Sequence, residues 1–119
     1  MNILAALCLV LSFSVFADDT LQEIKDMSQL AEIYASRDLS CEKASDCLVL
    51  AKGAKACGGP RTYTLTSAFN PDLQVLKDLL VELTKWEKEY HKRSGTISNC
   101  QITPVPRVAC SENFCSLVD

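Results

Sequence analysis

The segment CLVLAKGAKACGGPRTYTLTS, residues 47–67, decides the fold that we expect for this chain. It opens with a short apolar run, Cys47–Lys52, which contains valine and leucine and stops at a glycine, as strands often do. In residues 61–67, tyrosine and leucine alternate with threonines, which is the pattern of a half-buried strand. The segment therefore predicts two strands joined by a glycine-rich connection.

The connection contains a Cys-Gly-Gly-Pro corner that ends at Pro60. Gly58 or Gly59 can adopt a positive φ, and Pro60 fixes the φ angle that a bend requires. A phosphate-binding loop is not indicated, because such loops open a helix, whereas Pro60 leads into a predicted strand. We interpret the corner as a structural turn held by a disulfide at Cys57.

Two amphipathic helices are predicted on either side of these strands. The first begins at Thr20, which is followed three positions later by glutamate in a capping box, and it fades near residues 36–38. The second spans residues 71–93, with Asn70 as its N-cap and Gly95 just beyond its last turn. Its apolar stripe, residues 73–90, is expected to face the sheet.

The C-terminal part of the chain reads as short β segments, with a hairpin over residues 110–115. The element order predicts an α+β fold. We expect one small antiparallel sheet, made of both strand pairs, packed against one long helix, with an extra N-terminal helix and three disulfides.

The first residues, MNILAALCLVLSFSVFA (1–17), are almost wholly apolar. They are typical of a signal peptide cleaved after Ala17, and the apolar run is shorter than the roughly 20 residues of a spanning helix. The sequence thus predicts a secreted or periplasmic single domain, residues 18–119, that meets a membrane only through an uncleaved signal.

The cysteine count agrees with export. The chain has seven cysteines, and removal of Cys8 with the signal leaves an even set, as in disulfide-stabilised exported domains. Sequence does not choose among the possible pairings. On architectural grounds we favour Cys57 with Cys100, which leaves Cys41 and Cys47 to pair with Cys110 and Cys115.

No pattern indicates catalysis, a metal site or a cofactor. The single histidine, His91, falls on the polar face of the second helix and is expected to be solvated. The acidic residues are expected on helix surfaces, and the cysteine spacings do not suit zinc or a redox motif. We therefore expect a non-enzymatic protein, and its net charge of −3 argues against a nucleic-acid partner.

Charge is unevenly distributed along the chain. Residues 47–71 and 90–111 contain no aspartate or glutamate but several basic residues. If these converge they would attract an anionic envelope component or an acidic protein, and if they scatter they are ordinary solvated side chains. The candidate binding residues are Lys52, Lys55, Arg61 and Arg107.

A second hypothesis is protease inhibition. Arg61 and Arg107 each follow a proline and lie near a cysteine. Either could be presented on a disulfide-tied loop, where rigid presentation lowers the ordering cost of binding.

The strings CEKASDCLVLAKGAKACGGPRTY, SGTISNC and PVPRVACSENFC together resemble a group of small uncharacterised proteins exported by bacteria. Members share a C…DC…G…ACGGP..Y…C…P…C…C pattern, which here spans residues 41–115. The chain departs from it in placing Glu-Asn in the last turn, where similar sequences tend to show glycine. The resemblance implies a periplasmic or surface location and a shared scaffold, and it implies no activity.

Overall fold

The computed structural model describes residues 16–118, so the predicted signal peptide lies almost entirely outside the described residues. The elements, in chain order, are α1 (Phe16–Ala35), the 3-10 helix η2 (Ala44–Asp46), β1 (Cys47–Lys52), β2 (Thr62–Ser67), α2 (Leu73–Ser94), β3 (Arg107–Ser111) and β4 (Phe114–Val118). Within residues 16–118, no helix combines the length and apolar character needed to cross a membrane.

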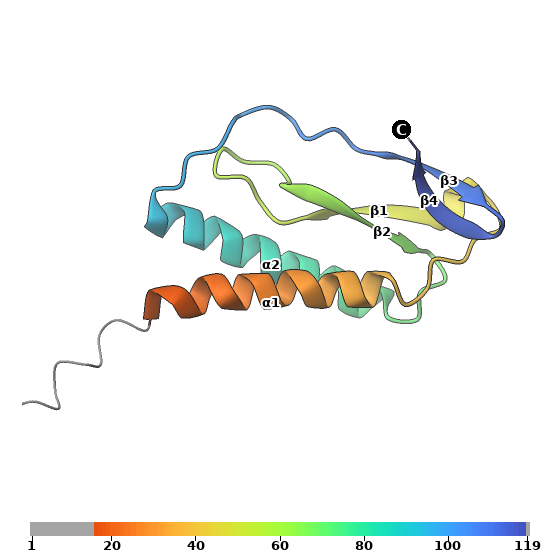
Figure 1. Cartoon of the computed structure of the whole chain (residues 1–119), viewed down its shortest axis with the longest axis horizontal. Coiled ribbons are helices and arrows are strands. Elements are labelled where there is room, and N and C mark those ends of the chain that lie inside the picture. The colour runs from red at the N-terminus through yellow and green to blue at the C-terminus, as the bar shows by residue number, and fades with distance from the viewer. Residues whose placement is uncertain (1–15, 119) are drawn as a thin grey trace, which may run out of the picture.

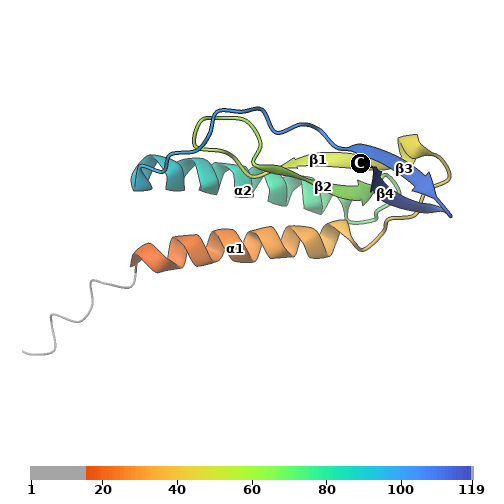
Figure 2. The same cartoon turned by 45° about the horizontal axis from the view of Figure 1, so that its top comes forward.

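The fold is α+β, as predicted. The two helices run side by side, and the strands lie on one side of the pair (Figures 1 and 2). The helices are nearly equal, with 20 residues in α1 and 22 in α2, so α1 is a full partner of α2 rather than an appendage.

The strands form two antiparallel two-stranded sheets rather than the single sheet that we expected. β1 pairs with β2 along its whole length, and β3 pairs with β4 in a separate hairpin. The hairpin is bound instead by the segment before η2: the Cys115 N–H donates to the Leu39 carbonyl, and the Cys41 N–H donates to that of Asn113. These bonds join β4 to residues 39–41, and no strand of the hairpin pairs with β1 or β2.

The core has two parts. Between the helices, Ala31, Ala35, Leu76 and Leu80 are buried together, and Leu50 of β1 packs on them. The second part surrounds the sulfur atoms of the C-terminal hairpin. The threonine side of β2 is the buried side, and Thr66 Oγ1 donates to the Ala35 carbonyl at 2.8 Å, so the strand lies directly against α1.

The helix ends differ in part from the sequence-based expectation. Thr20 does not cap α1, because the helix already begins at Phe16 and Thr20 lies inside it. Asn70 is not the N-cap of α2, which begins at Leu73. The Asn70 side chain is buried and its amide donates to the Tyr34 carbonyl, so it is used to join α1 to the start of α2. Gly95 ends α2 with φ 65°, as predicted.

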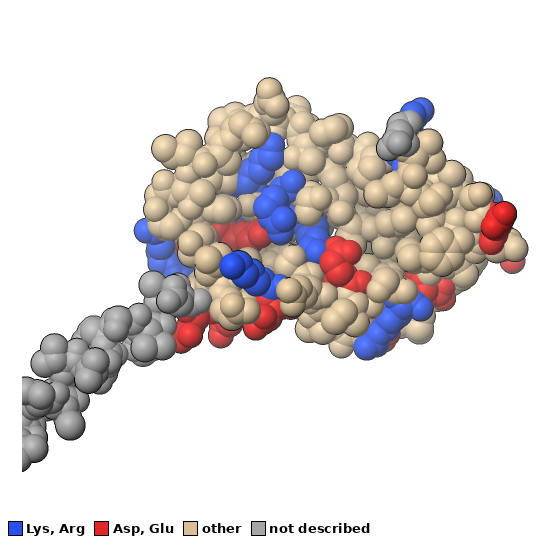
Figure 3. Space-filling model, in the orientation of Figure 1, with Lys and Arg blue, Asp and Glu red and all other residues tan. Residues whose placement is uncertain are grey.

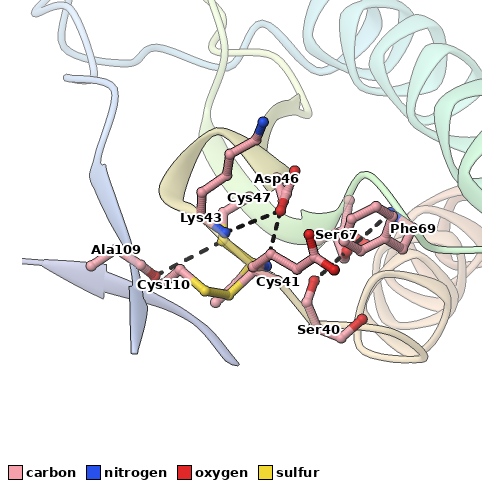
Figure 4. The surroundings of a disulfide bond; sticks show 12 residues. Ser40, Cys41, Lys43, Asp46, Cys47, Ser67, Phe69, Ala109 and Cys110 are labelled. Carbon is pink, nitrogen blue, oxygen red and sulfur yellow. Dashed lines mark hydrogen bonds between the residues drawn. A yellow bond between two sulfur atoms is a disulfide. The ribbon is translucent and has the colours of Figure 1, made fainter. Parts of the chain in front are cut away.

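The three disulfides join Cys41 to Cys110, Cys47 to Cys115 and Cys57 to Cys100. The Cys57–Cys100 bond is the pairing that we favoured, and Cys41 and Cys47 pair with Cys110 and Cys115 as expected, in an order that the sequence left open. The first two disulfides lie next to each other at the hairpin; Figure 4 shows the surroundings of the Cys41–Cys110 bond. In the same view, Asp46 accepts the backbone N–H of Lys43 at 3.1 Å. This region is therefore held both covalently and by hydrogen bonds.

A candidate anion-binding pocket at the Cys-Gly-Gly-Pro corner

The corner has the conformation that its sequence predicts. Gly58 and Gly59 both have positive φ, at 106° and 76°. The turn is closed by two backbone hydrogen bonds: the Gly58 N–H donates to the Lys55 carbonyl, and the Lys55 N–H donates to that of Gly59. Cys57 is bonded to Cys100, and its N–H donates to the Ser98 hydroxyl at 3.1 Å. The corner is therefore fixed to the segment that follows α2.

A second attachment of this loop, which sequence reasoning missed, comes from two side chains of α2. Glu87 Oε2 accepts the Ala54 N–H at 2.5 Å, and His91 lies 2.8 Å from the Ala54 carbonyl. A carbonyl only accepts, so His91 Nε2 is the donor. Glu87 and His91 are one helical turn apart, so together they hydrogen-bond both the N–H and the carbonyl of Ala54. His91 is half-buried and structural, not solvated as we expected, and Glu87 is buried, unlike a surface acid.

Gly53 allows this close approach. It has φ +74°, and a Cβ built at this position would lie 2.0 Å from Glu87 Oε2. Any side chain here would collide with the carboxylate and would also strain the backbone. The glycine after β1 is therefore required by the contact between the loop and α2, and not only by the end of the strand.

Two of the four predicted binding residues form ion pairs inside the fold. Lys52 is 5% exposed, and its Nζ donates to Glu32 Oε1 at 2.5 Å and to the Ser28 carbonyl at 3.0 Å. Arg61 Nε lies 2.9 Å from Glu87 Oε1. Their charges are thus compensated by acids of α1 and α2. The face drawn in Figure 3 shows basic and acidic side chains interleaved, not one basic field.

The other two residues lie apart. Arg107 begins β3, in the sheet that Figures 1 and 2 place at the opposite end of the molecule from the corner. Lys55 lies at the corner, where its Nζ donates to Asn99 Oδ1 at 3.0 Å and to the Gln101 carbonyl at 2.5 Å. The predicted four-residue face is therefore not assembled, and Lys55 is the member that remains in a suitable setting. Arg61 and Arg107 are both exposed; Arg61 contacts Glu87 and Arg107 is the first residue of β3, and inhibition by either stays a prediction.

Lys55 instead joins residues of α2 around a surface pocket of about 320 Å³. The pocket carries three lysines and a histidine, and no acidic residue lines it. Its lining residues are Lys55, Ala56, Cys57, Gly58, Lys88, His91, Lys92 and Thr96.

The charge of this pocket is largely uncompensated. Lys55 contacts two neutral oxygens, which leave its full charge in place and use two of the three donors of an ammonium. Lys92 lies 3.7 Å from Glu89, but both side chains are well exposed, where such pairs contribute little. The arrangement can bind an anionic group by charge and by the remaining lysine donors.

The residues that α2 contributes to this pocket could have been found from the sequence. Lys88, His91 and Lys92 recur at helical spacing, which places them on one side of α2. What the sequence does not show is that the corner crosses that side of the helix. No protein-family model matches the sequence, and no curated protein or solved structure is significantly similar to it.

Proposed function

We propose that this chain is an exported, non-enzymatic binding module that captures an anionic partner in the pocket beside the Cys-Gly-Gly-Pro corner. The observation that carries the proposal is the convergence of Lys55, Lys88, His91 and Lys92 on one concave site with no acidic lining residue. Such a site raises the local concentration of anions and orients them.

The way the pocket is built supports binding. Its loop is fixed on one side by the Cys57–Cys100 disulfide and on the other by the two hydrogen bonds to Ala54. A site whose backbone is already ordered loses little conformational entropy when a ligand arrives. The Lys55 ammonium is hydrogen-bonded to Asn99 and Gln101 beside the pocket, so its side chain is also partly ordered in advance.

The export part of the proposal is supported by the signal-like residues 1–17 and by the three disulfides, which persist in oxidising compartments. The partner would then be an anionic component of the cell envelope or an acidic protein. Mass spectrometry of the oxidised protein recovered after export should give an N-terminus at Asp18; a chain that retains Met1 in the cytosol would contradict export.

Titration of the oxidised protein with inorganic phosphate and then polyphosphate, followed by amide NMR shifts, tests the site. We expect shifts confined to residues 55–58 and 88–96, which weaken with added salt. Lys92→Glu should weaken binding by roughly tenfold, because the change replaces attraction by repulsion at the pocket. Arg93→Glu is the matched control, since Arg93 is also a basic residue of the last turn of α2 but does not line the pocket. Equal loss in both variants, or shifts spread over the surface, would reject the pocket.

A further inference from the structure

A second concave surface lies between β1 and α2. It has a volume of about 530 Å³ and no residue of β2 lines it. Leu50 and Ala51 are successive residues of β1, and their side chains point to opposite faces of the sheet. A groove that contacts both residues therefore runs along the edge of the strand. The lining residues are Leu50, Ala51, Lys77, Leu80, Val81, Thr84, Lys85 and Lys88.

The strand edge at this groove is open to pairing. Within residues 16–118, β1 pairs with β2 only, so one side of its ladder has no strand partner. An edge strand presents backbone N–H and C=O groups that can accept a further strand. Many proteins blunt such edges with a bulge or a proline, but Cys47–Lys52 contains no proline and pairs without a bulge along its full length.

The floor of the groove is apolar and partly exposed. Val81 is 55% exposed, although it lies beside Leu50 and Leu80 on the groove surface. When an extended peptide adds to a strand edge, alternate side chains of the peptide enter pockets beside that edge. The exposed valine in this groove offers such a pocket an apolar surface.

The rim of the groove is cationic. Lys77, Lys85 and Lys88 line it, and no acidic residue does. Lys85 lies 3.3 Å from Glu82, but both side chains are exposed, so this pair offers weak compensation. A second copy of the chain is a poor occupant, because edge-to-edge pairing would bring these lysines near their own equivalents.

We propose that an extended acidic peptide of a partner protein adds to the free edge of β1. Its backbone extends the sheet, and the side chains on its α2-facing side are in turn apolar groups that lie on Leu80 and Val81 and carboxylates that meet the rim lysines. The inference deepens the proposed function and rests on it for Lys88, which lines both the groove and the cationic pocket. The pocket then receives an acidic group at one end of the same peptide.

The first experiment measures binding of the full oxidised protein to capped octapeptides by fluorescence anisotropy. In the main probe, every second residue is in turn valine or glutamate, so that both face α2, and serine occupies the positions between them; in a second probe, lysine replaces glutamate. Two further probes carry N-methyl groups at the odd or at the even residues of the main probe. Because a strand bonds its neighbour through alternate residues, one methylated series should lose binding by roughly tenfold or more while the other retains it.

The lysine probe should not bind. Strand addition would be overturned if both methylated series bind equally well or lose binding equally. It would also be overturned if the main probe does not bind at about 1 mM, a concentration well above the dissociation constant expected of a specific site. Hydrogen exchange gives a direct readout: amides of β1 should gain protection with the main probe, an effect that charge attraction alone does not produce.

Variants separate this inference from the proposed function. Val81→Asp should weaken binding of the peptide severalfold and leave binding of phosphate intact. Val75→Asp is its matched control, because Val75 is a similarly exposed valine of α2, at 48%, that does not line the groove. Lys92→Glu should weaken the binding of phosphate far more than the binding of the peptide. Phosphate binding without peptide binding rejects the inference alone, and peptide binding without phosphate binding rejects the pocket alone. Circular dichroism of each variant confirms that it is folded.

Discussion

Removal of the Glu87 carboxylate should be among the most damaging single changes in this chain. Glu87 is 6% exposed, and it accepts the N–H of Ala54, itself buried, while Arg61 contacts its other oxygen. In Glu87→Ala the Ala54 N–H loses a charged acceptor, which costs about 2 kcal/mol. The Arg61 side chain is 43% exposed, so its pair is screened and adds only about 0.5–1 kcal/mol. We expect a total loss of about 2.5–3 kcal/mol in the free energy of unfolding.

Urea denaturation of the oxidised protein, followed by circular dichroism, measures this loss. Glu89→Ala is the control, because Glu89 is an exposed glutamate of the same helix, and it should change stability by less than about 0.5 kcal/mol. Arg61→Ala should cost no more than about 1 kcal/mol, since it leaves the Ala54 bond in place. If Glu87→Ala is as mild as the control, or if Arg61→Ala costs as much as Glu87→Ala, the contact between the loop and α2 does not hold the corner as described.

The remaining predictions concern the same framework. Gly53→Ala should destabilise the fold by at least about 2 kcal/mol, because its Cβ meets the carboxylate below it, whereas Gly58→Ala has open space and should cost about 1 kcal/mol from its φ alone; the same denaturation compares them. Replacing Cys57 and Cys100 together by serine should lower the stability by about 3–4 kcal/mol, measured against the oxidised parent. Backbone hydrogen bonds, chiefly from the residue four positions earlier, lower the pKa of Asp46 from its ordinary value of 3.8. The resulting stability is present above pH 3.8 and is lost as the pH falls through the lower pKa of the folded state, so Asp46→Asn should flatten the acid limb of a stability–pH curve.

Local features of the fold were predictable because nearby residues specify them. The positive φ of Gly58 and Gly59 follows from the sequence of the corner, and the end of α2 follows from Gly95. The α+β class follows from the order of the periodic segments. Each of these features depends on contacts within a few positions along the chain, where the rules of turns and caps apply.

The residues that were misread are those whose setting depends on contacts between distant segments. Glu87 and His91 are polar residues at polar positions of a helix, and only the passage of the loop after β1 across α2 buries them. Lys52 ends a strand, as an exposed lysine would, but its side chain crosses to α1 and pairs with Glu32. The single-sheet prediction failed for a similar reason, because residues 39–41, which lie outside every strand expected from the sequence, pair with β4.

The disulfide pattern has a consequence for how the chain must mature. Each bond joins one of the first three cysteines, at 41, 47 and 57, to one of the last three, at 100, 110 and 115. A chain that enters an oxidising compartment with its N-terminus first exposes three thiols before any native partner has crossed. Any bond formed at that stage is non-native and must be exchanged later through a thiolate. If the chain is exported as we propose, its correct maturation is favoured by delayed oxidation or by catalysed disulfide exchange.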